Sequence, residues 1–262
     1  MSGFREGRLA ALRAKIAALE AGGRADSESL SLGDPILDAA FPGGGLPLGQ
    51  WHEFTGDGME AETCAAPAAF AALLAAPLAR RGEAVWILRR DDLFAPGLAG
   101  LGFPAARLIQ VCAHDEAEAL AVAEDALATP GVSAVFAEVD GVDLTAGRRL
   151  QLACEKRGAT GFIVRRRPYG GAGRKAAAGS AAATRWRIAP AASAPALDAL
   201  GLGPPRWRAS LERCRGGRPA EWLVEAVNAY TWEAQHGTHP LRLVAELGDR
   251  ELAPADPLRL AG

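Results

Sequence analysis

The chain has 262 residues and a formal net charge of −2, and 49% of its residues are hydrophobic. This length suits one large domain, or one domain with appendages, and the apolar content is ample for a buried core. The near-neutral charge excludes a uniformly basic chain, so any surface for nucleic acid must be local. No apolar run approaches the ~18–20 residues of a membrane span. The 4 cysteines are far apart and form no CxxC pair, which argues against a metal site or a disulfide framework.

The N-terminal segment predicts an amphipathic helix over residues 4–21, because apolar residues recur there at three-to-four spacing with arginine and lysine on the other side. These apolar residues are Leu9, Leu12, Ile16 and Leu19. Gly22 and Gly23 end the helix, so residues 1–24 are expected to form a helix and linker. The apolar stripe either packs on the chain's own core or binds a partner. The segment lacks the apolar run of a signal peptide, which predicts a cytoplasmic protein.

The segment from Ser31 to Thr63 reads as a short helix, a glycine turn, a strand, a loop and the start of a helix. Asp34 is a good N-cap for a brief helix over Pro35–Ala40. Gln50–Thr55 alternates and carries aromatic residues, as a strand does. An alanine-rich helix is predicted over Thr63–Arg81.

The loop between this strand and this helix has the place and length of a phosphate-binding loop, GxxxxGK[ST]. Its residues are Gly56, Asp57, Gly58, Met59, Glu60, Ala61, Glu62 and Thr63. Ala61 stands where the second glycine is expected, and Glu62 stands where the lysine is expected. A phosphate loop points backbone N–H groups and one lysine at a polyanion, whereas this loop presents three carboxylates. We therefore predict a degenerate site with no nucleotide cofactor. The alternative is an unrelated glycine turn before a helix.

Strands and helices alternate in the middle of the chain, which predicts an α/β fold with a doubly wound, mostly parallel sheet. The predicted strands are Ala84–Leu88, Leu108–Val111, Ser133–Val139, Thr160–Val164 and Thr184–Ile188. The predicted helices are Glu116–Ala128 and Gly147–Arg157. Arg206–Arg213 and Glu221–Val227 enclose two glycines and predict an antiparallel hairpin at one edge of the sheet. Residues 233–262 are expected to form a loose tail, with Leu241–Val244 as a short partner-docking motif.

A resemblance follows from these motifs. The run SLSLGDPILDAAFPGGGLPLGQWHEFTG resembles the segment that leads into the phosphate loop of RecA/RAD51-type recombinases. More closely, the chain resembles the ImuA family, the RecA-like (also called SulA-like) accessory proteins of bacterial damage-induced mutagenesis. The broken loop, the run Ala183–Ile188, and Glu212–Pro219 with Glu221–Leu223 carry this resemblance. It implies a RecA-like core over residues 25–232.

The resemblance also implies roles for two strand ends. In the recombinases an acidic residue soon after the strand that aligns with Ala84–Leu88 activates the attacking water. Arg89 or Arg90 stands there in this chain, although Asp91 is one step away. The strand Ser133–Val139 corresponds to the Walker B strand, whose terminal acid helps to hold magnesium. Either Glu138 or Asp140 takes that place.

Residues 165–180 form a glycine-rich basic loop in the position of the recombinase loop that contacts single-stranded DNA. Its candidate DNA-binding residues are Arg165, Arg166, Arg167, Tyr169, Arg174 and Lys175. Cations on such a loop can follow a phosphate backbone, and Tyr169 can stack on a base. The alternative is an ordinary solvated loop.

The resemblance implies a non-catalytic accessory factor of the SOS response that supports error-prone translesion DNA synthesis. The partners it implies are an ImuB-like inactive Y-family polymerase, an error-prone replicative-type DNA polymerase, RecA and single-stranded DNA, with self-association as a further possibility. No metal, cofactor or membrane is expected. Two alternatives stay open. One is an ATP-dependent recombination or repair protein, supported by Thr63 and by the acids at Glu138 and Asp140. The other is a SulA-like cell-division inhibitor.

Overall fold

A computed structural model describes residues 28–63, 65–166, 181–193, 203–227 and 241–247. The strands of its main sheet are β3 (Trp51–Gly56), β4 (Glu83–Leu88), β5 (Leu108–Cys112), β6 (Val132–Val139), β7 (Thr160–Arg165), β8 (Thr184–Ala191), β9 (Arg206–Cys214), β10 (Ala220–Ala226) and β11 (Leu241–Glu246). The helices are α2 (Pro35–Asp38), α3 (Glu60–Thr63), α4 (Ala66–Ala79), α5 (Glu116–Leu127) and α6 (Leu144–Arg157). Two 3₁₀ helices, η1 (Ala95–Leu101) and η2 (Ala105–Arg107), precede β5. The short strands β1 (Ser29–Leu30) and β2 (Leu46–Pro47) pair with each other.

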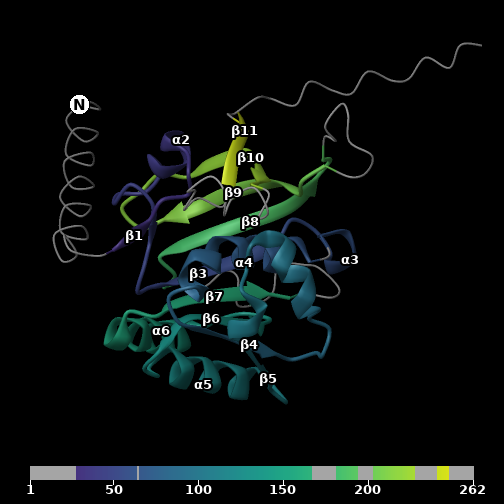
Figure 1. The fold of residues 1–262 in the computed structure, drawn as a ribbon. Helices are drawn as coiled ribbons and strands as arrows, with labels where there is room; N and C mark the ends of the chain where they lie inside the picture. The colour runs from purple at the N-terminus through teal and green to yellow at the C-terminus, as the bar shows by residue number, and fades with distance from the viewer. Residues whose placement is uncertain (1–27, 64, 167–180, 194–202, 228–240, 248–262) are drawn as a thin grey trace, which may run out of the picture.

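The main sheet has the strand order β11-β10-β9-β8-β3-β7-β6-β4-β5 (Figure 1). From β8 to β5 every neighbouring pair is parallel, and from β8 to β11 every pair is antiparallel. The predicted α/β class with a mostly parallel sheet is therefore confirmed. The predicted hairpin is also confirmed, because β9 and β10 pair antiparallel, with Ala209 opposite Trp222. The N-terminal helix predicted over residues 4–21 lies outside the described residues.

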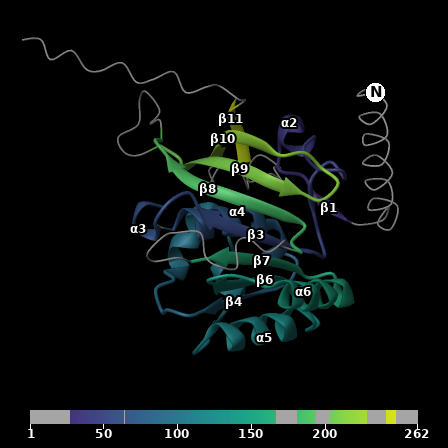
Figure 2. The same cartoon turned by 180° about the vertical axis from the view of Figure 1, so that it is seen from behind.

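Helices cover both faces of the parallel half of the sheet. α4 packs on one face against β3, β6, β7 and β8, and α5 and α6 pack on the other face. In Figure 2, α5 and α6 lie in the lower part of the molecule beside β4 and β6, whereas β8 to β11 lie in the upper part. The doubly wound arrangement places the carboxyl ends of β3, β4, β6 and β7 at one edge, where the degenerate loop lies.

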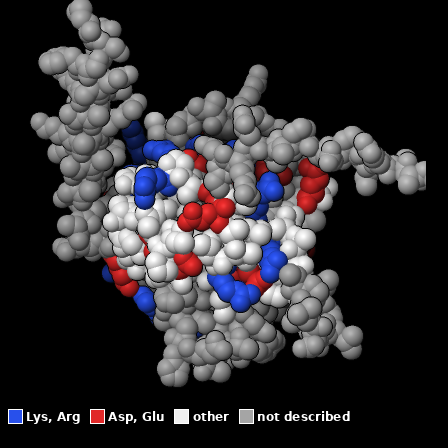
Figure 3. Space-filling view, turned by 90° about the horizontal axis from the view of Figure 1, so that it is seen from above, with Lys and Arg blue, Asp and Glu red and all other residues white. Residues whose placement is uncertain are grey.

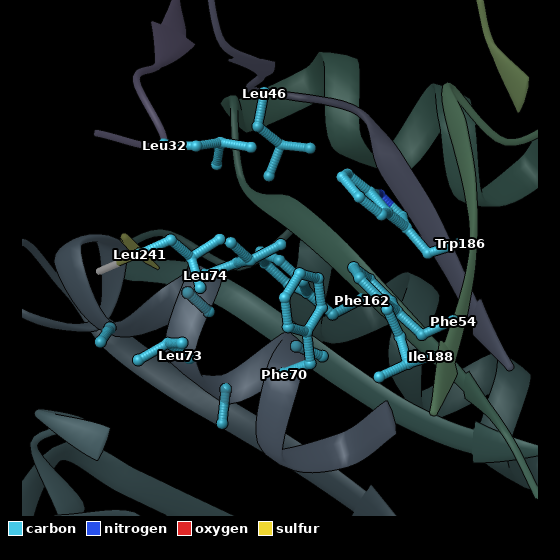
Figure 4. Close-up of a cluster of buried hydrophobic side chains, with 14 of the residues drawn as sticks. Leu32, Leu46, Phe54, Phe70, Leu73, Leu74, Phe162, Trp186, Ile188 and Leu241 are labelled. Carbon is cyan, nitrogen blue, oxygen red and sulfur yellow. The ribbon is translucent and has the colours of Figure 1, made fainter. Parts of the chain in front are cut away.

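The larger core cluster lies between α4 and the sheet. The Phe54 ring on β3 lies between the rings of Phe162 and Trp186, at centroid distances of 6.0 Å and 6.4 Å respectively. Phe70 on α4 packs against the same group (Figure 4). α4 has apolar residues on all sides because nearly the whole helix is buried. The cluster extends through Trp207 and Trp222 to the antiparallel half. The two halves of the sheet therefore share one core.

Two element boundaries differ from the predictions, and one predicted cap agrees with them. The helix predicted over Thr63–Arg81 is α4, which begins only at Ala66. The residues Glu60–Thr63, predicted as part of the loop, form the separate helix α3, with a turn at Ala65 before α4. α6 begins three residues earlier than predicted, because the carboxylate of Asp143 accepts a hydrogen bond from the Ala146 N–H at 2.8 Å and caps the helix there. The predicted N-cap at Asp34 is confirmed, since its carboxylate accepts from the Ile36 N–H at 2.8 Å.

The largest correction concerns the C-terminal segment. Leu241–Val244, expected to be a docking motif in a loose tail, forms most of β11 and pairs antiparallel with β10. Leu241 is buried in the larger core cluster opposite Ala226. The alternation of this run is that of an edge strand with one buried face, a signal that the short length of the run concealed.

The described surface carries charges of both signs. Seen from above, Lys and Arg side chains are interspersed with Asp and Glu side chains (Figure 3), which is consistent with the net charge of −2. Among the described residues, none of the helices has the length and apolar character that a membrane span requires.

Candidate functional site

The loop predicted to be a degenerate phosphate loop lies between β3 and α4 and borders a cavity of about 470 Å³. The loop, the first turn of α4, the segment after β4 and the ends of β6 and β7 form its walls. The residues that line it are Thr55, Gly56, Gly58, Glu60, Ala61, Thr63, Ala65, Pro67, Ala68, Asp92, Leu93, Glu138, Val164, Arg165 and Arg166. The sequence-predicted loop and one predicted strand end are thus brought together around one space.

The Glu62 side chain is hydrogen-bonded to a backbone N–H group of the loop itself. Its carboxylate accepts a hydrogen bond from the Met59 N–H at 2.9 Å. Glu62 is the third residue of α3, so this contact is the carboxylate half of a capping box, without the side-chain acceptor that Ser or Thr would provide at position 59. The Thr63 hydroxyl donates to the Met59 carbonyl at 3.2 Å. Gly58 has φ +122°, and a Cβ there would lie 2.5 Å from the Glu62 carboxylate. An internal carboxylate therefore lies over the loop, at the position where the motif has a lysine.

Arg166 joins three carboxylates across the cavity. It follows β7, and its guanidinium binds Asp92 through two parallel contacts, Nη1 to Oδ1 at 2.7 Å and Nη2 to Oδ2 at 2.9 Å. Nη1 also donates to Glu138 at 2.9 Å, and Nε donates to Glu60 at 3.1 Å. The three acids come from α3, the segment after β4 and the end of β6. One side chain thus links the loop to two other segments of the site by charge-assisted hydrogen bonds.

The pKa values of Asp92 and Glu138, two of the acids around Arg166, are shifted in opposite directions. The hydrogen bonds from Arg166 lower the pKa of Asp92. Burial raises the pKa of Glu138, although Arg166 and the Trp86 indole N–H, 3.0 Å away, both stabilise its charged form. Burial opposes the charge of Arg166, but its carboxylate partners outweigh burial and raise its pKa. The guanidinium is therefore permanently charged, and the pKa of Glu138 is shifted in the opposite direction to that of Asp92.

Both arginines that could stand at the predicted position of the recombinase acid, Arg89 and Arg90, are engaged in ion pairs. Arg90 pairs with Glu60 at 3.2 Å, and Arg89 pairs with Asp140 at 3.3 Å. Glu138 is buried and lines the cavity, whereas Asp140 is exposed and does not line it. Of the two Walker B alternatives, only Glu138 faces the cavity. Among the described residues, no group of three or more His, Cys, Asp and Glu side chains is arranged to hold a metal ion.

The first two residues of the predicted basic loop are paired with acids. Arg165 is buried, and its guanidinium donates to Glu53 at 2.8 Å and to the Asp140 carbonyl at 3.1 Å. Arg185 shares Glu53 at 3.4 Å. The other candidates, Arg167, Tyr169, Arg174 and Lys175, lie outside the described residues, as do Leu9, Leu12, Ile16 and Leu19.

Sequence reasoning missed the internal partners of Arg165 and Arg166. One signal was available: Glu53 is an acid inside the apolar strand β3, and a buried carboxylate requires a cation on a neighbouring strand. No comparable signal pointed to the joint role of Glu60, Asp92 and Glu138. These three residues are far apart in the sequence, and only the parallel order of β3, β7, β6 and β4 brings them together.

Known proteins resemble this chain in sequence and in fold. No protein-family model matches the chain. The chain is 60% identical over 249 residues to Protein ImuA from two strains of Caulobacter vibrioides, a match that covers 93% of this chain and 100% of each relative. The crystal structure of a KaiC-like protein from the archaeon Pyrococcus horikoshii OT3 superposes with a TM-score of 0.52 and 13% identity, over 84% of this chain and 100% of that chain. At that identity the structural likeness concerns the fold alone.

Proposed function

The chain belongs to the ImuA family, and on that premise we propose that it is a non-catalytic RecA-like accessory factor of the SOS response to DNA damage. Membership of this family implies a role in damage-induced mutagenesis. In our proposal the chain supports error-prone translesion synthesis by contacting an ImuB-like inactive Y-family polymerase, an error-prone replicative-type polymerase and RecA. The fold provides the scaffold for these contacts, and the former nucleotide site carries no turnover.

The observation that supports a non-catalytic role is the carboxylate chemistry of the site. Glu62 lies over the loop in place of a lysine and uses the Met59 N–H. Glu60, Asp92 and Glu138 converge on Arg166 in the cavity. Each carboxylate near a triphosphate would repel it by about 1–4 kcal/mol, depending on the local dielectric. An ATP-dependent recombinase needs a lysine in this loop, where this chain has Glu62, so we do not favour that alternative.

For contact with single-stranded DNA we propose the basic loop, with Arg167, Tyr169, Arg174 and Lys175 as the contacting residues. Arg165 and Arg166 are engaged with carboxylates, so we assign them to anchoring the start of this loop rather than to phosphate contacts. For the partner proteins we propose the amphipathic segment 4–21, whose apolar stripe needs a cover.

A complementation experiment tests the proposal. In a bacterium that lacks its own ImuA protein, expression of this chain should restore damage-induced mutation after ultraviolet irradiation. Thr63→Ala removes the one hydroxyl that a phosphate loop would use for magnesium, and we expect it to restore mutation as well as the unchanged chain does. Deletion of residues 1–24 should lower the mutation frequency because it removes the proposed partner segment. If Thr63→Ala abolishes mutagenesis at an unchanged protein level, the non-catalytic role is wrong.

A further inference from the structure

The walls of the cavity beside the degenerate loop are largely apolar. The apolar lining residues are Ala61, Ala65, Pro67, Ala68, Leu93 and Val164. The volume of about 470 Å³ is within the range of roughly 300–1,000 Å³ that is typical of ligand pockets. The two cations on its walls, Arg165 and Arg166, are already paired with carboxylates. The space therefore suits one or two apolar side chains better than a polyphosphate, which needs available donors and cations on the walls.

Two large apolar side chains are exposed on segments that line this cavity. Met59 is 47% exposed and lies between Gly58 and Glu60, which both line it. Phe94 is 73% exposed, the highest value among the exposed large hydrophobic residues of the described chain, and it follows Leu93. Neither side chain lines the cavity itself. Both are exposed on segments that border it, where each would lose water on contact with a partner. Burying a Phe or Met side chain contributes about 1.5–3 kcal/mol.

The segments around the cavity carry an excess of negative charge. Thr55–Thr63, Arg89–Leu93, Glu138 and Val164–Arg166 together hold six acidic and four basic residues. Arg166 is already shared by three carboxylates, and Arg165 is paired with Glu53 outside these segments. Asp57 is half-exposed and lies 3.8 Å from the Arg187 guanidinium, which is also outside these segments. Within the cavity, the charge of these described segments therefore favours a cationic partner and disfavours an anionic one.

From these observations we propose that the cavity is a docking site for a peptide segment of a partner protein, with an apolar anchor residue flanked by Lys or Arg. The anchor enters the space between the loop and α4. Met59 and Phe94 cover it from the rim, and the basic flanks face the carboxylates. The inference rests on the proposed function, because it gives the protein contacts proposed there a specific site on the core.

The same observations disfavour the other occupants of such a cavity. A nucleotide or a nucleic acid would bring phosphates to Glu60, Asp92 and Glu138, which accept hydrogen bonds and donate none. Interfaces between proteins, in contrast, depend on apolar and aromatic anchors buried in pockets, with polar groups at the rim. The combination of an apolar cavity, an exposed Phe and Met, and an acidic rim fits that pattern.

Site-specific crosslinking tests the site in the full chain. Phe94 is replaced by the photoreactive p-benzoylphenylalanine, which keeps an aromatic side chain there. The matched control carries the same group at Leu152, which is 66% exposed on α6 and does not line the cavity. After irradiation of DNA-damaged cells, the crosslinked peptide is sequenced by mass spectrometry. We expect crosslinking at position 94 and not at 152, to a segment with an apolar residue flanked by Lys or Arg.

The crosslinked segment, made as a synthetic peptide, then allows the affinity to be measured. Met59→Ser and Phe94→Ser should each weaken binding about fivefold or more, because truncating an interface anchor costs over about 1 kcal/mol. Leu152→Ser should leave the affinity unchanged. A crosslink to nucleic acid, to a second copy of this chain or to a segment without basic residues overturns the inference, as does equal crosslinking at both positions or none at either. If the chain still restores mutagenesis in that case, the proposed function stands and only this site is wrong.

Discussion

His52 shows how a single buried residue fixes both a protonation state and a junction in the sheet. It lies on β3 in a hydrogen-bonded chain. The Trp186 indole N–H donates to the Thr184 hydroxyl at 2.9 Å, which donates to His52 Nδ1 at 2.8 Å, and His52 Nε2 donates to the Pro47 carbonyl at 2.9 Å. The carbonyl can only accept, so Nε2 carries the proton and the ring is neutral. All the polar groups in this series of hydrogen bonds have partners only when the His52 ring is neutral and protonated at Nε2.

Acidification should therefore destabilise the protein through His52. Burial lowers its pKa to about 4, against about 6.5 in an unfolded chain. Between these values the unfolded state binds more protons, so stability falls as the pH falls. We expect a loss of about 2 kcal/mol between pH 7 and pH 5, measured by urea unfolding. His52→Gln, which does not titrate, should be less stable at pH 7 and lose this pH dependence.

The exposed His114 provides the control. His114→Gln should keep the stability of the unchanged chain at pH 7 and the same loss at pH 5. A His52→Gln variant that loses as much stability on acidification as the unchanged chain would show that another group titrates in this range.

The candidate site shows what a sequence can and cannot reveal at the residue scale. The positions of Ala61 and Glu62 in the loop are readable from the motif alone, and so is the loss of the lysine. The use that the fold makes of Arg166 is not readable, because its partner Glu60 is 106 residues away along the chain. Local charge runs predict solvent or DNA contacts. Pairing with buried acids depends on strand order, which spacing in the sequence does not encode.

At the scale of elements, periodicity predicted every strand of the parallel half of the sheet and the β9–β10 hairpin, and it failed where an element is short. The turn at Ala65 before α4 was concealed because alanine has a high helix propensity. β11 was missed because its six residues follow a stretch with no pattern. In the structure, the register shifts between Leu223 and Val224, which pair with Ala245 and Leu243, so that Val244 is an extra residue on β11.

The role of β11 can be tested by two substitutions on the same strand. Leu241 is 3% exposed within the core cluster, whereas Val244 is 39% exposed. Leu241→Ala should lower the free energy of unfolding by about 2–3 kcal/mol, because it removes buried methyl groups and leaves a cavity. Val244→Ala should change it by less than about 0.5 kcal/mol. Chemical denaturation of both variants is the measurement, and equal, negligible effects would return these residues to a loose tail.

At the scale of the whole molecule, ion pairs within the protein link the segments at the carboxyl ends of the parallel strands. In an active recombinase, a bound nucleotide would lie between these segments. Arg166 ties α3 to the segment after β4 and to the end of β6. Glu53 ties β7 to β8 through Arg165 and Arg185. These contacts need no ligand, so we expect one conformation of the core in the presence and absence of nucleotide.

Thermal unfolding with and without Mg-ATP tests this expectation. A ligand at about 100 times its Kd would stabilise the folded state by about 2.7 kcal/mol, which a melting curve resolves. We expect no shift in Tm, with MgCl₂ and salt of equal ionic strength as the control.

The Glu62→Lys variant should bind little nucleotide, because Ala61, Asp57 and Glu60 remain and Arg166 still spans the cavity. Phosphate release should stay at background with and without single-stranded DNA. Turnover that Thr63→Ala abolishes would show instead that the loop still binds and hydrolyses ATP.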